Sequence, residues 1–276
     1  MPLVNMTPLL RQAKEENRAV GAFNVSSVEM IYGVMQAAEA LHTPVILQVA
    51  EKRLATTPLS LLGPAIVAAA RQSSLPIAAH LDHGETEECV AQALDLGFSS
   101  VMFDGSLLPT EESVRRTSAA VRMAHAYGAT CEGEIGVLGR GENGEVAAAR
   151  YTDPDEAVWF AEQTGVDALA VAIGNAHGVY EGTPVFHFEV LESIRERSDV
   201  PLVLHGGTGS SEANFRRCIA SGVRKINIAT AFFMAAADAA RQAPPHYFEM
   251  SGAVVRAVRE IAETHIRLFG VSAPQG

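Results

Sequence analysis

The sequence predicts an α/β fold, a closed (β/α)8 TIM barrel with an N-terminal helix before it and an extra C-terminal helix after it. Short apolar, β-branched runs alternate with longer helical patterns eight times along the chain, which is typical of a parallel sheet with helical crossovers. The runs are almost continuously apolar, so both faces of the sheet should be covered. Roughly 250 residues is the usual size of such a barrel, and the chain has 276. No linker interrupts the alternation, so residues 1–276 are expected to form one barrel domain.

The eight expected strands follow one another in chain order. Three of them come directly after Pro44, Pro76 or Pro201, where a missing backbone donor is tolerated. The alternative architecture, a doubly wound open sheet, should carry a GxGxxG turn after its first strand. The first strand here ends in AFNVSS instead. The strands are expected at residues 19–25, 44–50, 76–82, 100–105, 129–136, 168–174, 201–206 and 225–230.

Helical patterns fill the intervals between the strands. Residues 26–42 begin with Ser26, the expected N-cap, and carry Glu29 three residues later, which is the spacing of a capping box. Residues 86–97 and 210–222 each end on a glycine. Glycine is the usual residue for leaving a helix in a left-handed conformation.

Composition and charge exclude several classes of protein. The net charge is −11 and no cluster of basic residues offsets it, so nucleic acid and acidic membranes are disfavoured as partners. No apolar run approaches the ~20 residues of a membrane span, and the N-terminus lacks the pattern of a secretory signal. Three cysteines without CxxC spacing fit a reducing compartment better than a disulfide framework. A cytoplasmic location is therefore expected.

Polar side chains gather where the expected strands end, and in a barrel these C-terminal ends carry the active site. His83, His177 and His205 follow the third, sixth and seventh strands. Three imidazoles with an open fourth position match a catalytic Zn²⁺ site. One such histidine alone is more often an ordinary loop residue, but three at one rim favour a metal site. The strand ends also carry Asn24, Asp82, Asp104, Glu132, Glu134, Asn175, Asn227 and Thr230.

The other six histidines are not expected to bind the metal. His80 lies within the third expected strand, where a packed or supporting role is expected. The rest fall on helices or beside them, where solvated or capping roles are the default: His42, His125, His187, His246 and His265.

Two turns, the glycine-rich segment 205–211 and the segment 227–231, run into helices after the last two strands. Barrels often hold a phosphate there on backbone N–H groups at helix N-termini, which requires no lysine. A plain glycine-rich turn is the alternative. The position beside the three histidines favours a phosphate site.

The segment 136–150 is glycine-rich, polar and long for a βα loop. Long loops in compact domains are usually lids or inserts. This loop offers Glu142 and Glu145 as general bases over the rim, and solvated loop carboxylates are the alternative for both.

Taken together, these motifs resemble those of the class II, metal-dependent fructose- and tagatose-bisphosphate aldolase family over nearly the whole chain. The most specific part is the combination of HLDHG at 80–84, GNAHGVY at 174–180 and LHGGTG at 204–209. The remaining matches are AFN at 22–24, SVMFDGS at 100–106, EGEIG at 132–136 and KINIAT at 225–230.

The resemblance implies an aldehyde-lyase of carbohydrate metabolism. Such an enzyme cleaves a fructose- or tagatose-bisphosphate-like ketose phosphate reversibly into dihydroxyacetone phosphate and an aldehyde, through a zinc-stabilised enediolate. Zinc acts there as a Lewis acid, while a carboxylate takes the proton of the C4 hydroxyl. The resemblance also implies a homodimer or homotetramer and admits a monovalent cation.

The metal ligands implied by the resemblance are His83, His177 and His205. Asp104 and Glu134 would hold a second, alternative or outer metal position. All five lie at strand ends in the sequence, in agreement with the site expected from the barrel alone.

The resemblance also implies catalytic and substrate-binding residues. Asp82 would be the acid/base at the aldehyde-derived oxygen, and Glu142 would move a proton at the dihydroxyacetone phosphate carbon. The substrate-binding residues would be Asn24, Gly178, Gly206, Gly207, Thr208, Asn227, Ile228, Ala229 and Thr230.

The sequence departs from the family pattern on the aldehyde side and in the loop. Ala50 stands where many members have a serine that contacts the aldehyde partner. Arg140 and Asn143 are atypical of the mobile loop, and Ala229 resembles tagatose-type members, since fructose-type members often have Asp there. The identity of the aldehyde, and with it the pathway, therefore stays open.

The last helical pattern, 252–270, carries Arg256 and Arg259. They are candidates for contacts to the aldehyde partner across a subunit boundary. Surface charges on an amphipathic helix are the alternative.

Three other functions remain as alternatives. A Schiff-base aldolase needs a reactive lysine inside the barrel, but Lys225, the only lysine on an expected strand, opens the eighth strand at the wrong end. A metal-dependent hydrolase of the amidohydrolase type should carry HxH after the first strand, which AFNVS lacks. The third alternative is a metal barrel that binds a sugar phosphate without turning it over, which the atypical loop suggests.

Overall fold

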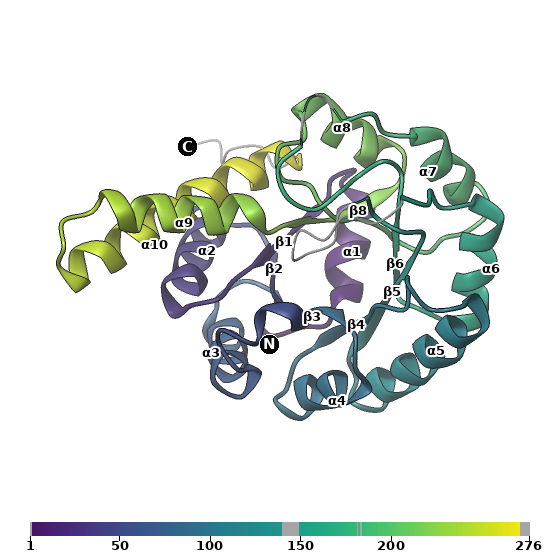
Figure 1. Cartoon of the computed structure of the whole chain (residues 1–276), viewed down its shortest axis with the longest axis horizontal. Helices are drawn as coiled ribbons and strands as arrows, with labels where there is room; N and C mark the ends of the chain where they lie inside the picture. The colour runs from purple at the N-terminus through teal and green to yellow at the C-terminus, as the bar shows by residue number, and fades with distance from the viewer. Residues whose placement is uncertain (1, 140–148, 181, 183, 271–276) are drawn as a thin grey trace.

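The computed structural model describes residues 2–139, 149–180, 182 and 184–270. Its centre is a closed barrel of eight strands in chain order, each parallel to its neighbours, with β8 returning to pair with β1 (Figure 1). The strands are β1 Val20–Asn24, β2 Val45–Ala50, β3 Ile77–Gly84, β4 Ser100–Phe103, β5 Thr130–Ile135, β6 Ala168–Val171, β7 Leu202–Leu204 and β8 Val223–Ile228.

Helices surround the barrel, and α9 and α10 extend together to one side of the ring (Figure 1). No helix in the described ranges combines the length and the apolar character needed to cross a bilayer. The helices are α1 Met6–Glu15, α2 Val28–Ala40, the 3₁₀ turn η1 Glu51–Arg53, α3 Leu59–Gln72, α4 Glu87–Asp95, α5 Thr110–Ala126, α6 Pro154–Thr164, α7 Phe188–Arg195, α8 Glu212–Ala220, α9 Thr230–Gln242 and α10 Tyr247–Leu268.

Helix α1 covers the N-terminal end of the barrel. Its apolar face, Met6, Leu9, Leu10 and Ala13, forms a buried cluster with residues at or near the starts of the strands. This cluster is separate from the larger core between the strands and the outer helices. Because this end is packed with side chains, the C-terminal rim is left for a substrate site. The strand residues of the cluster are Val20, Ala22, Ile46, Ala78, Ala168, Ala170 and Val203.

The structure confirms the predicted (β/α)8 barrel with one helix before it and one after it. The predicted boundaries were wrong at one helix N-cap and at the ends of the last three strands. The N-cap of α2 is Ser27, whose hydroxyl accepts from the N–H of Met30, and not Ser26. The last three strands end earlier than expected, because Gly174 and Gly206 turn the chain with positive φ and Thr230 already begins α9. An apolar run marks burial, and the buried chain continues past the last ladder hydrogen bond.

The close packing of α2 on α10 supplies a test of the fold. A Cβ atom added at Gly33 in α2 would lie 2.7 Å from the carbonyl oxygen of Val255 in α10. We therefore expect Gly33→Ala to lower the free energy of unfolding by about 1–3 kcal/mol through overpacking, measured by urea denaturation.

The matched control is Gly252→Ala within α10, where an added Cβ meets only the end of the Arg256 side chain at 3.4 Å. Alanine should raise helix stability there by about 0.5–1 kcal/mol. Equal effects of the two substitutions would contradict the close approach of the helices.

Candidate metal centre and active site

Three histidines meet at the C-terminal rim of the barrel. His83 lies at the end of β3, while His177 and His205 lie in the loops after β6 and β7. The ring centroid of His83 is 4.9 Å from that of His177 and 4.6 Å from that of His205. One ring nitrogen from each residue lies within 4.8 Å of the others. The three histidines expected at one rim are therefore close enough to bind one ion.

The backbone at His83 has an unusual conformation that turns its side chain toward the other two rings. His83 has φ +43°, a left-handed value that is rare for a residue with a Cβ atom. The pairing of β3 with β4 shifts register between Leu81 and Gly84, and such irregularities re-aim side chains at functional sites. Strain of this kind persists where the surrounding structure requires it.

Each of two histidines is held by a carboxylate on one nitrogen. Asp104 Oδ2 lies 2.8 Å from His83 Nδ1, and Glu132 Oε1 lies 2.8 Å from His205 Nε2. An ionised carboxylate only accepts, so these nitrogens carry the protons. The opposite nitrogens, His83 Nε2 and His205 Nδ1, are then free to bind a metal, as in the carboxylate–histidine pairs of metal sites.

The free nitrogens fit a divalent cation. His83 Nε2 and His205 Nδ1 are buried and have no hydrogen-bond partner among the described residues. Leaving such groups unsatisfied costs about 1–3 kcal/mol each, and a bound cation would satisfy both. Nitrogen donors with a nearby carboxylate suit Zn²⁺ among common metals.

Glu134 adds an oxygen to the same place. Its Oε2 atom is buried, lacks a hydrogen bond within the described chain, and lies 3.4 Å from His205 Nδ1. Burial, and next the charge of Asp104, raise the pKa of Glu134 well above its ordinary value, and a cation would reverse this. His83, Asp104 and Glu134 form a second candidate group of ligands that shares His83 with the first.

Asp82 lies beside His83, with one oxygen held by each of two amides. Asn24 Nδ2 donates to Oδ2 at 2.9 Å, and Asn227 Nδ2 donates to Oδ1 at 3.0 Å. Gln48 in turn donates to Asn24 at 2.7 Å. Burial opposes ionisation of Asp82, but electrostatic interactions with His83, His205 and Lys225 lower its pKa below the ordinary value. Asp82 is therefore a buried, oriented proton acceptor.

Lys225 and Glu132 form a buried ion pair below the histidines. Lys225 Nζ lies 2.9 Å from Glu132 Oε2, and both side chains are fully buried. Burial would raise the pKa of Glu132, but Lys225 and the hydrogen bond from His205 lower it. Burial, and then Lys225, also lower the pKa of the enclosed His80 to about 3. His80 thus stays neutral and supports the site from within the barrel, as expected for a strand histidine.

The expectation for Lys225 was wrong in two respects. Lys225 does not open the eighth strand, because β8 already begins at Val223. The Lys225 backbone pairs with Val20 at the start of β1, but its side chain runs inside the barrel and reaches Glu132. The sequence contains a signal for this, since Lys225 and Asn227 are two residues apart and side chains two apart on a strand share a face. With 0% of the side chain exposed, Lys225 Nζ is not accessible from the rim.

A small cavity next to His177 collects most of the expected substrate-binding residues. Helix α9 begins beside it without a side-chain cap at Ala229, while Thr208 Oγ1 accepts from the N–H of Ala231 at 3.2 Å. A helix N-terminus of this kind favours an anion. The lining residues are Asn24, His177, Gly178, Gly206, Thr208, Asn227, Ala229 and Thr230.

Local contacts hold the two loops of this cavity together. Asn175 Nδ2 donates to the carbonyl of His205 at 3.0 Å, and the Tyr180 hydroxyl donates to that of Gly206 at 2.7 Å. Gly206 has φ +66°, and a Cβ atom there would lie 2.2 Å from the carbonyl oxygen of Ala176. Only glycine fits at this position.

The remaining expected residues lie outside the cavity. Gly207 donates its N–H to the carbonyl of Asn227 at 3.1 Å, and the Ile228 side chain is fully buried in the apolar core. Glu142, Glu145, Arg140 and Asn143 lie outside the described residues. In α10, Arg259 pairs with Glu263 at 2.7 Å and Arg256 is exposed.

A (β/α)8 barrel whose rim brings together three histidines able to bind one metal ion, a buried aspartate and a small cavity at a helix N-terminus, here called the anion cradle, is typical of metal-dependent enzymes that act on phosphorylated small molecules. Comparison with known sequences gives the particular family. The chain belongs to the class II fructose-bisphosphate aldolase family, whose sequence model matches residues 4–273. The protein is therefore an aldolase, an aldehyde-lyase.

The relatives carry more than one substrate name. A probable fructose-bisphosphate aldolase of Bacillus subtilis is 39% identical, with 99% of each chain covered. A 6-phospho-5-dehydro-2-deoxy-D-gluconate aldolase of Halalkalibacterium halodurans is 38% identical over 87% of this chain and 85% of its own. The crystal structure of the YdjI aldolase from Escherichia coli K12 superposes with a TM-score of 0.89, at 36% identity and 98% coverage of both chains.

The buried ion pair can be tested by a double-mutant cycle. Lys225→Met leaves the Glu132 carboxylate buried without its cation and should lower the free energy of unfolding by about 3–5 kcal/mol. Adding Glu132→Gln should recover most of this loss, because the amide carries no charge and still accepts from His205. Urea denaturation of the metal-free protein measures both values. A double variant no more stable than Lys225→Met alone would contradict the pairing.

Proposed function

We propose that this protein is a zinc-dependent aldolase that cleaves a ketose phosphate reversibly into dihydroxyacetone phosphate and an aldehyde. The observation that carries the proposal is a pair of buried nitrogens, on His83 and His205, that have no hydrogen-bond partner among the described residues. Both residues are grouped with His177, which lines the cavity at the start of α9. The family membership supports the reaction type.

His83, His177 and His205 would hold the zinc ion, with Glu134 at a second or alternative position. Once bound, the ion would act as a Lewis acid that stabilises negative charge next to the ketose carbonyl. Asp104 and Glu132 fix the tautomers of His83 and His205, which keeps the free nitrogens directed at one point.

Asp82 would accept the proton of the substrate's C4 hydroxyl when the carbon–carbon bond breaks. The amides of Asn24 and Asn227 hold its two oxygens in place, and its lowered pKa keeps it ionised and ready to accept. In the synthesis direction the same carboxyl would return the proton. We propose Glu142 for proton transfer at the dihydroxyacetone phosphate carbon.

The phosphate of the substrate would lie in the cradle beside His177. The backbone N–H groups of Gly206, Thr208 and Thr230 would bind it, with help from the Thr208 hydroxyl, while the N–H groups of Gly207 and Ala231 stay bonded within the protein. Lysine is not needed for this interaction, because helix N-termini and glycine-rich turns supply the donors.

The aldehyde half of the substrate is where this chain differs from its family's pattern. Ala50 pairs with Asp82 in the register of β2 and β3, so a methyl group stands next to the proposed base where a serine hydroxyl is common. The relatives also carry different substrate names, which is in line with a difference in the aldehyde product. A panel of ketose mono- and bisphosphates, assayed for release of dihydroxyacetone phosphate, identifies the substrate.

We further propose that the enzyme acts in the cytoplasm as a homodimer or homotetramer. The projecting pair α9 and α10 exposes large apolar side chains, among them Tyr247 at 66% and Phe248 at 76% exposure. Apolar groups clustered on a projection favour association between copies of the chain.

Replacement of the proposed base gives the main test of this mechanism. Asp82→Ala should keep the fold and the zinc but lower turnover by about 10²–10⁴, the usual contribution of general acid–base catalysis. Release of dihydroxyacetone phosphate measures the rate, and Asp238→Ala on the exposed face of α9 is the control. Near-native turnover of Asp82→Ala would exclude this role.

Removal of a proposed ligand should remove the metal. His205→Ala should lose zinc, measured by elemental analysis of the purified protein, whereas His125→Ala on the surface should retain it. In the parent protein a chelator should abolish activity and borohydride with substrate should leave it intact. Zinc at the parental level in His205→Ala would show that the ion binds elsewhere.

A further inference from the structure

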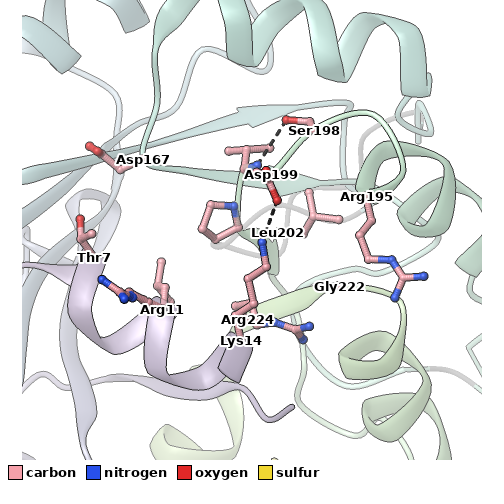
Figure 2. A pocket seen from close by; sticks show the side chains of 13 residues that line it. Thr7, Arg11, Lys14, Asp167, Arg195, Ser198, Asp199, Leu202, Gly222 and Arg224 are labelled. Atoms are coloured by element: carbon pink, nitrogen blue, oxygen red, sulfur yellow. Dashed lines mark hydrogen bonds and ion pairs between the residues drawn. The ribbon is translucent and has the colours of Figure 1, made fainter. Parts of the chain in front are cut away.

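A second cavity lies at the opposite end of the barrel from the proposed active site. It has a volume of about 290 Å³ and lies between α1, the segment 198–202 before β7, and the beginning of β8 (Figure 2). Because α1 and its apolar cluster fill the N-terminal end of the barrel, this cavity does not connect with the rim.

The cavity is basic, although the chain as a whole is acidic. Four cationic side chains line it, Arg11, Lys14, Arg195 and Arg224, together with two carboxylates. Asp199 pairs with Lys14 at 2.7 Å (Figure 2), and Asp167 accepts from the backbone of Cys131 and lies 2.9 Å from a ring nitrogen of His125. Arg11 is neutralised by Glu15, which lies 3.1 Å away in α1.

Arg195 and Arg224 have no such counter-charge. Within the described ranges neither guanidinium has a carboxylate within 4.0 Å, and the hydrogen bonds they donate go to backbone carbonyls. Arg224 Nη1 donates to Ile219 and Val223, and Arg195 Nη1 donates to Ala220, each at 2.7 Å. These bonds leave further N–H donors of both forks available to a ligand.

The burial of Arg224 makes the lack of a carboxylate partner significant. Only 8% of Arg224 is exposed, and buried charges are normally paired. Arg195 and Arg224 line the same cavity, so their like charges repel each other. Burial, and then the charge of Arg195, lower the pKa of Arg224. The aliphatic part of Arg195 packs on Gly222, with its Cδ 3.2 Å from where a Cβ atom of residue 222 would stand. This packing holds the Arg195 guanidinium in place, and the two backbone hydrogen bonds hold that of Arg224. An anion would relieve the repulsion and accept from both.

We propose that this cavity is a binding site for a small metabolite that carries a phosphate or carboxylate group, held by Arg195 and Arg224. The apolar walls, Leu10, Val200, Pro201 and Leu202, suit a short carbon skeleton behind the anionic group. The site is separate from the substrate cradle and does not depend on the proposed reaction.

Calorimetric titration of the zinc-loaded protein with inorganic phosphate and, separately, with succinate tests the site. We expect Arg195→Gln and Arg224→Gln to weaken binding of at least one anion roughly tenfold or more, since a charge-assisted hydrogen bond is lost. Arg216→Gln on the exposed face of α8 is the control and should bind as the parent does. Release of dihydroxyacetone phosphate in the absence of added anion should be the same in Arg195→Gln and the parent.

The two probes separate the sources of the anionic group. Either anion can also bind at the rim, phosphate in the cradle and succinate at the zinc ion, so only the part of its binding that is lost in Arg195→Gln counts for this site. Loss with phosphate alone identifies a phosphorylated ligand, and loss with succinate identifies a carboxylate. Arg195 is exposed, so its variant should fold even if Arg224→Gln does not. Unchanged binding of both anions in Arg195→Gln would overturn the proposal.

Discussion

The geometry of the rim depends on how the barrel accommodates one buried charge pair. Glu132 lies between Lys225 and His205, fully enclosed, and a carboxylate in that position is tolerated only because a cation and a hydrogen-bond donor share it. The hydrogen bond fixes the tautomer of His205 and so determines which nitrogen faces the metal position. Asp104 does the same for His83. The candidate metal site at the rim of the barrel thus depends on charges in the barrel interior.

The second determinant is the closure of one end of the barrel. Helix α1 packs against the starts of the strands, which leaves the C-terminal rim for catalysis. The same helix forms one wall of the second cavity. The two proposed anion sites use different chemistry at these two ends. Backbone amides and a hydroxyl surround the rim cradle, whereas the cavity beside α1 offers two arginines without carboxylate partners. A net charge of −11 is compatible with both, since each site depends on local donors.

Family membership and substrate choice rest on different observations. Family membership rests on the sequence model that matches residues 4–273. Ala50, next to Asp82 in the sheet register, lies in the part of the site that we propose meets the aldehyde. Relatives of nearly equal similarity carry different substrate names, so membership of the family does not by itself identify the substrate.

Much of the fold was predictable from local signals. The alternation of apolar runs and helical patterns determined the eight strands and their order, and polar residues at strand ends indicated which histidines meet, because a parallel barrel brings all its carboxyl ends to one rim. Cap and strand boundaries were less predictable, since burial extends beyond the ladder hydrogen bonds and either Ser26 or Ser27 is a suitable cap. Only the tertiary structure decided the tautomers of His83 and His205, the reach of Lys225 to Glu132, and the meeting of Arg195 and Arg224 beside α1. Those features depend on side chains from distant parts of the chain, and on which hydrogen-bond and charge partners remain within reach once these side chains are buried.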